Sequence, residues 1–126
     1  MQENAYEYPE PVWQLFRQTP RAGRFAPDSG TVLVGEARTP AADSVLRLEL
    51  LVEDGAVADA RFQAHGCPVS IAVGAWLADH SVGRGRAELD MIRSRQLIDT
   101  LEIPEDRAHC AFLGEDALRH ALEQWP

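Results

Sequence analysis

The chain has 126 residues, and its 20 acidic residues outnumber its 12 basic ones, so that its formal net charge is -8. A negative charge of this size disfavours binding to nucleic acids and to anionic membranes. Every basic residue is an arginine, which excludes a Schiff-base lysine and the lysine of a nucleotide-binding P-loop.

The composition also bears on domain organisation and compartment. We expect residues 1–7 to form a flexible leader and residues 8–126 to form a single domain, because no repeat or linker interrupts the second range. The chain has two distant cysteines, no signal peptide and no apolar run of membrane length. These features predict a reducing compartment, the bacterial cytoplasm, and no membrane association.

The domain is expected to begin with a helix and a short strand. The helix covers residues 8–19, with its apolar side chains on one face, and Pro20 stops it. A β-branched run predicts a strand over residues 31–35. Residues 36–43 include threonine, proline and alanines, and we interpret them as a connecting loop.

Two longer strands are expected next. Apolar residues alternate with other residues over residues 46–52 and again over residues 58–65. The dipeptide Asp54-Gly55 between these segments is typical of a tight hairpin. With helical segments on either side, the pattern predicts an α+β fold in which a three-stranded antiparallel sheet has helices packed on one face.

Cys67 stands where the last strand gives way to a helix. Pro68 suits a first helical position, and residues 69–77 are apolar almost all round, as in a helix that is buried in a core. Cys67 is therefore expected near the N-cap, where the helix dipole favours an anion. Its thiol should ionise more readily than a free one and act as a metal ligand or a nucleophile. The alternative is a cysteine that only fills space.

More helices are expected in the last third of the chain. Short helices are predicted near residues 88–92 and 95–101, and the second of them ends before Pro104. Apolar residues recur at intervals of three and four over residues 113–125, which predicts a final amphipathic helix. Cys110 comes just before this pattern, so it too is expected near a helix start.

Four residues form a candidate metal-binding set. Cys67 and Cys110 both lie at junctions that lead into helices, His109 precedes Cys110, and Asp43 lies in a loop that could reach them. Two soft thiolates with an imidazole and a carboxylate suit zinc or iron. The spacing of the cysteines is not the CxxC of most structural zinc sites. The alternative is that His109 is an ordinary polar loop residue and that Asp43 only caps a turn.

The order of elements and three stretches of sequence resemble the IscU/NifU family of iron-sulfur cluster assembly scaffolds. The stretches are DARFQAHGC with the buried helix after it, RAHCAFLGEDAL, and VWQLFRQTPRAGRF. The resemblance covers residues 8–124. It implies that Cys67, Cys110, His109 and Asp43 match ligands that the family gathers at one exposed tip. The implied cofactor is a labile 2Fe-2S cluster or a zinc or iron ion.

Three departures from the family pattern bear on function. The family's first cysteine belongs to a Cys-Gly-Asp stretch, whereas this chain has Ala41-Ala42-Asp43, so the missing thiol falls at Ala41 or, after a one-residue slip, at Ala42. Pro68 stands where the family usually has a small residue. Residues 103–107 replace the stretch that the family offers to its Hsp70 chaperone, and we do not expect this chaperone to dock.

The missing thiol has consequences for the bound ion. With one thiolate fewer, an iron-sulfur cluster should be labile, and zinc should be the ion found in purified protein. His65 lies two residues before Cys67 on the predicted strand, and we expect it to supply part of what the missing cysteine would have given.

Three functions remain open. The leading one is a non-enzymatic, scaffold-like protein of iron-sulfur cluster assembly with a cysteine desulfurase as its partner. The second is a sulfur acceptor like the SufE family, which shares this architecture and would use Cys67 to accept persulfide sulfur. The third is a domain that has kept the fold and now mediates protein contacts. The pair His109-Cys110 favours the first function, because a SufE-like acceptor needs only one cysteine.

Overall fold

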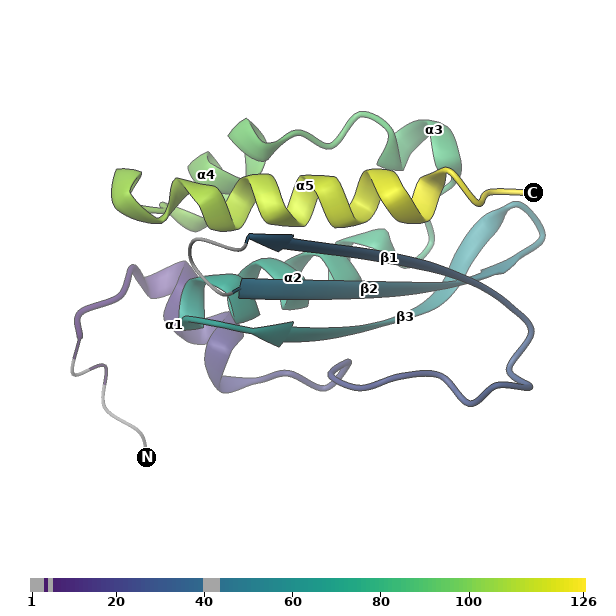
Figure 1. Cartoon of the computed structure of the whole chain (residues 1–126), viewed down its shortest axis with the longest axis horizontal. Helices are drawn as coiled ribbons and strands as arrows, with labels where there is room; N and C mark the ends of the chain where they lie inside the picture. The colour runs from purple at the N-terminus through teal and green to yellow at the C-terminus, as the bar shows by residue number, and fades with distance from the viewer. Residues whose placement is uncertain (1–3, 5, 40–43) are drawn as a thin grey trace.

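A computed structural model describes residue 4, residues 6–39 and residues 44–126 of the chain. None of the described helices is long and apolar enough to cross a membrane. The helices and strands, which are labelled in part in Figure 1, are α1 (Glu10–Arg17), β1 (Thr31–Thr39), β2 (Ser44–Glu53), β3 (Ala56–His65), α2 (Pro68–Ser81), α3 (Arg86–Leu89), α4 (Ser94–Leu101), the 3-10 helix η1 (Glu105–Arg107) and α5 (Ala108–Leu122).

The three strands form one antiparallel sheet in the order β1-β2-β3, which confirms the predicted fold class (Figure 1). Successive residues of a strand point to opposite faces. Leu46, Leu48 and Leu50 of β2 are fully buried on the face that is covered by helices. Arg47 and Glu49 belong to the other face, which we call the open face.

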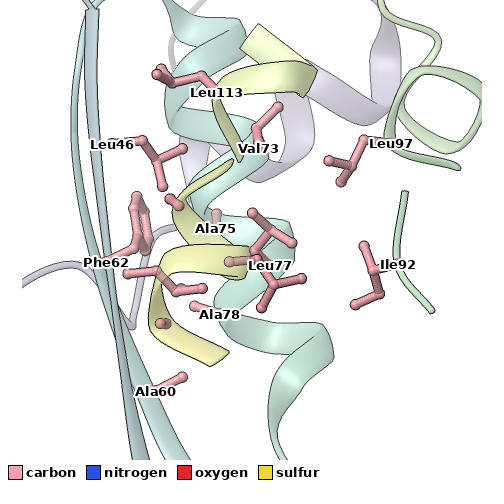
Figure 2. Packing of buried hydrophobic residues seen from close by; sticks show 14 of the residues in the cluster. Leu46, Ala60, Phe62, Val73, Ala75, Leu77, Ala78, Ile92, Leu97 and Leu113 are labelled. Atoms are coloured by element: carbon pink, nitrogen blue, oxygen red, sulfur yellow. The ribbon is translucent and has the colours of Figure 1, made fainter. Parts of the chain in front are cut away.

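Helices α2 and α5 pack against the leucine face of the sheet, and Figure 1 shows α2 behind the strands. Figure 2 looks into the core between these layers, where Leu46 and Phe62 extend from the sheet towards Val73 and Leu77 of α2. Leu113 of α5 belongs to the same buried cluster. Burial of these apolar side chains is the main stabilising contribution to the fold.

Helix α2 is buried on nearly every side, as its apolar composition predicts. It packs against the sheet and also against helices α1 and α5. Gly74 permits the close approach to β3, because a Cβ at this position would lie 2.6 Å from Cδ2 of Phe62. The helix that carries Cys67 at its start is therefore held firmly against the sheet.

Strand β1 is longer than the sequence indicates. Residues 36–39, which we predicted to be loop, continue the strand and pair with residues 44–47. The prediction was wrong because Glu36 and Arg38 lie on the open face, where polar side chains stay in contact with water while the backbone pairs with β2. The rest of the predicted loop, residues 40–43, lies outside the described residues.

The hairpin between β2 and β3 turns at Asp54 and Gly55, whose φ angles are 52° and 78°. Positive φ at both positions is what a type I′ hairpin turn requires. We expect Gly55→Ala to lower the free energy of unfolding by about 1 kcal/mol, because the new side chain strains the backbone. The loss should be no larger, because a Cβ there meets nothing within 4 Å. Urea unfolding followed by circular dichroism measures the loss, and a loss several times larger would contradict this account.

Candidate metal centre

Cys67 lies at the N-cap of α2, where the sequence places it, two residues after the end of β3. The connecting residue Gly66 has a φ of +145°, which side chains rarely adopt. A Cβ at Gly66 would also lie 2.9 Å from Oγ of Ser44 and 3.2 Å from Oγ of Ser70. This glycine therefore lets the chain pass from strand to helix in one residue, and it sets the Cys67 thiol beside the first turn of α2.

Cys110 reaches the same place from the start of α5. The helix begins at Ala108, earlier than the predicted residue 113, so that Cys110 lies in its first turn. The sulfur atoms of Cys67 and Cys110 are 3.8 Å apart. Both are free thiols, and Cys110 is buried whereas Cys67 is partly exposed. The structure thus brings together the two cysteines that the sequence singles out.

Ser70 is a third member of this cluster, and our reading of the sequence missed it. Its hydroxyl oxygen lies 3.3 Å from the sulfur of Cys110 and 3.9 Å from the sulfur of Cys67, and the residue is fully buried. The available signal was a serine in an otherwise apolar helix, one turn after Cys67. A buried hydroxyl needs a hydrogen-bond partner, and residues three apart share a helix face.

The contacts within this cluster make the two thiols unequal. A hydrogen bond from the Cys110 thiol lowers the pKa of Cys67, and the amide and hydroxyl of Ser70 and the amide of Val69 lower it further against the opposing effect of burial. The pKa of Cys110 is raised, because its proton is held between the two sulfurs and because the thiol is buried. These contacts therefore favour ionisation of the partly exposed Cys67 over ionisation of the buried Cys110.

The sulfur separation fits two ligands of one tetrahedral metal ion. With zinc-sulfur bonds of roughly 2.3 Å, two thiolates on one zinc ion lie about 3.8 Å apart. The observed separation of Cys67 and Cys110 is 3.8 Å. A zinc ion would supply Lewis acidity and a fixed tetrahedral geometry here, and it would draw the remaining proton from Cys110. Two further ligands are needed to close the tetrahedron.

The other predicted ligands are not gathered with the cysteines in the described part of the chain. His109 is half-buried in the first turn of α5. His65 is exposed and borders a hollow on the open face, beside its cross-strand partner Val45. Asp43 lies outside the described residues. Among the residues that are described, no three His, Cys, Asp or Glu side chains are placed to hold one metal ion.

Comparison with solved structures defines the class of fold. The chain is similar to a proposed iron-sulfur cluster assembly scaffold protein for the SUF system of Fervidobacterium islandicum AW-1, with a TM-score of 0.76 and 17% identity over 95% of this chain and 99% of that one. It is also similar to a nitrogen-fixing NifU-like protein (N-terminal) from Brucella abortus, with a TM-score of 0.74 and 19% identity over 91% of each chain. At such identities the likeness shows the fold alone.

Sequence comparison then identifies the family. Residues 7–126 match the NifU-like N terminal domain. The chain is 34% identical over 121 residues to the iron-sulfur cluster assembly scaffold protein IscU of Azotobacter vinelandii. These residues cover 95% of this chain and 87% of that protein. It is 29% identical over 119 residues to the protein of the same name from Escherichia coli K12, which covers 94% and 93%. The chain therefore belongs to the NifU/IscU family of iron-sulfur cluster assembly scaffolds, a non-enzymatic class, which confirms the resemblance.

Proposed function

We propose that this chain is a scaffold-like protein of iron-sulfur cluster assembly that holds zinc, iron or a labile 2Fe-2S cluster through Cys67 and Cys110. The observation that carries this proposal is the 3.8 Å separation of the two sulfur atoms at the starts of α2 and α5. Asp43 and His109 would complete the ligand set, and Ser70 would orient the buried thiol. A cysteine desulfurase is the proposed source of sulfur.

The metal content of freshly purified protein tests this proposal. We expect roughly one zinc ion per chain by elemental analysis, because zinc tolerates a mixed set of ligands. After anaerobic reconstitution with iron and sulfide, the protein should show the visible absorbance of a 2Fe-2S cluster and lose it readily to a chelator. Protein that holds neither zinc nor iron and forms no cluster would refute the proposal. A sulfur acceptor and a domain that mediates protein contacts would then remain.

A second function is favoured by the partly exposed Cys67 thiolate at the N-cap of α2. In a SufE-like sulfur acceptor, this thiolate would attack the outer sulfur of a persulfide on the desulfurase. A new sulfur-sulfur bond would form as the old one breaks, and the desulfurase cysteine would leave as a thiolate. Mass spectrometry after incubation with a desulfurase and free cysteine would show one added sulfur atom at Cys67 in protein that binds no metal.

The departure at residues 103–107 bears on partners. Pro104 precedes η1, whose residues Glu105 and Asp106 are acidic and exposed. Because these charges oppose the basic character of the family's chaperone-binding stretch, no Hsp70 docking is proposed.

Restoring the missing thiol should stabilise a bound cluster. We expect Ala41→Cys or Ala42→Cys to lengthen the lifetime of a reconstituted cluster at least about tenfold, since outer-shell partners alone change metal affinity by about 10 to 100-fold. The decay of cluster absorbance under a chelator is measured for the parent and for both variants. If neither variant outlasts the parent, the absent cysteine is not what limits cluster retention.

A further inference from the structure

The open face of the sheet carries charged side chains that the metal centre does not use. Cross-strand pairing places Glu36, Arg47 and Gln63 in one row, with Arg38 and His65 at the two sides of the next row. The helices cover the opposite face, as Figure 1 shows for α2. This row of side chains therefore faces solvent.

A hollow of about 350 Å³ opens on this face, bordered by Arg24, Arg38, Arg47 and His65. One half-buried carboxylate, that of Glu36, pairs with Arg38 at 3.0 Å and with Arg47 at 3.5 Å. The guanidinium of Arg24 donates to a neutral amide, and it forms no ion pair within the part of the chain that the structure describes. The hollow is thus cationic in a chain whose net charge is -8.

A second hollow of about 570 Å³ adjoins the first, since Arg24 and Arg47 border both. Its far side is apolar and includes Phe25, Val32 and Val34. The surface therefore offers cations at one end and an apolar floor at the other, which matches a ligand that carries carboxylates next to an apolar side chain.

A buried carboxylate holds this surface in shape. Glu49 is only 3% exposed, accepts a hydrogen bond from the amide of Phe25 at 2.9 Å and pairs with Nε of Arg47 at 2.8 Å. The guanidinium of Arg61 lies 4.8 Å from the centre of the Phe25 ring. The loop that carries Arg24 and Phe25 is therefore fastened across the sheet, and both hollows exist before any partner binds. Such pre-organisation reduces the cost of binding.

We propose that the open face of the sheet binds a short acidic peptide segment of a protein partner. Its carboxylates lie against Arg24 and Arg38, and a neighbouring apolar side chain rests on Val32 and Val34. A nucleic acid is a poor occupant, because three arginines around one hollow in a chain of net charge -8 are too few to follow a phosphate backbone. A peptide fits the run of two joined hollows, one charged and one apolar, better than a small anion, which would use only the first.

Fluorescence anisotropy tests this proposal with two labelled peptides. One repeats the triplet Glu-Asp-Leu, and the matched control repeats the triplet Gln-Asn-Leu. We expect saturable binding of the acidic peptide that weakens with added salt, and no saturable binding of the amide peptide. Arg24→Glu combined with Arg38→Glu should weaken binding at least about tenfold. The same variant should bind zinc as the parent does, which separates this proposal from the metal-binding function.

The control variant combines Arg86→Glu with Arg95→Glu, which changes the net charge equally at exposed positions of α3 and α4. It should bind the peptide as the parent does. The proposal is overturned if both variants lose affinity equally, if the amide peptide binds as well as the acidic one, or if the parent shows no saturable binding up to about 1 mM. Sedimentation that shows self-association lost only in the Arg24 and Arg38 variant would instead assign this face to a second copy of the chain.

Discussion

Replacing either Cys67 or Cys110 with serine is expected to lower the affinity for zinc more than about 100-fold. Loss of an outer-shell partner costs about 10 to 100-fold, and loss of a thiolate ligand should cost more. The two sulfurs are 3.8 Å apart, as two ligands of one ion should be. The zinc affinities of the two variants should therefore fall by similar factors. Competition with a chromogenic chelator measures both affinities on folded protein.

Ser70→Ala is the matched control for these cysteine variants. Its hydroxyl lies 3.3 Å from the sulfur of Cys110, but it is proposed to orient that sulfur and not to bind the ion. We expect a loss of affinity of about tenfold, in the range of outer-shell partners. Cys110 is fully buried, so thermal unfolding of Cys110→Ser and Cys110→Ala must accompany the titration. A cysteine variant that keeps the parental affinity would remove that residue from the ligand set.

The central part of the fold could be predicted from sequence because local patterns and burial agree there. Strands β2 and β3 alternate in polarity, and the hairpin has the residues that its turn requires. Helix α2 is apolar on nearly every side because it is buried on nearly every side. The second half of β1 could not be predicted, because residues 36–39 owe their strand conformation to pairing with β2. Such pairing leaves little signal in the residues themselves.

The candidate site, like the fold, could be predicted from the sequence only in part. Both cysteines could be placed at helix starts from the residues around them, and the family resemblance brought them together. Ser70 was missed because a serine in a helix does not by itself indicate contact with a thiol 40 positions away. The cationic hollow could not be found either, since Arg24, Arg38 and Arg47 meet only through the register of the sheet and the path of the loop after α1.

Gly35→Ala should lower the free energy of unfolding by about 3 kcal/mol or more, at or above the upper end of the usual cost of overpacking. Gly35 lies in β1 where α5 crosses it, and a Cβ there would lie 1.9 Å from the carbonyl oxygen of Ala117 and 2.6 Å from the amide nitrogen of Ala121. These are backbone atoms of a helix, so they cannot rotate away as a side chain could. The strand is also tied to the segment just after α5 by the Gln124 side chain, which accepts a hydrogen bond from the Val34 amide at 3.0 Å.

Because Gly35 has no need of a positive φ, its variant isolates steric contact, whereas Gly55→Ala isolates backbone strain. Urea unfolding of the two variants should therefore give losses that differ by roughly 2 kcal/mol or more. Adding Ala121→Gly to Gly35→Ala should restore only part of the stability, since it removes the Cβ that lies 2.9 Å from the new methyl group but leaves the carbonyl of Ala117 in place. A Gly35→Ala variant no less stable than Gly55→Ala would mean that α5 does not lie this close to β1. The start of α5, and with it Cys110, would then have to be placed differently relative to Cys67.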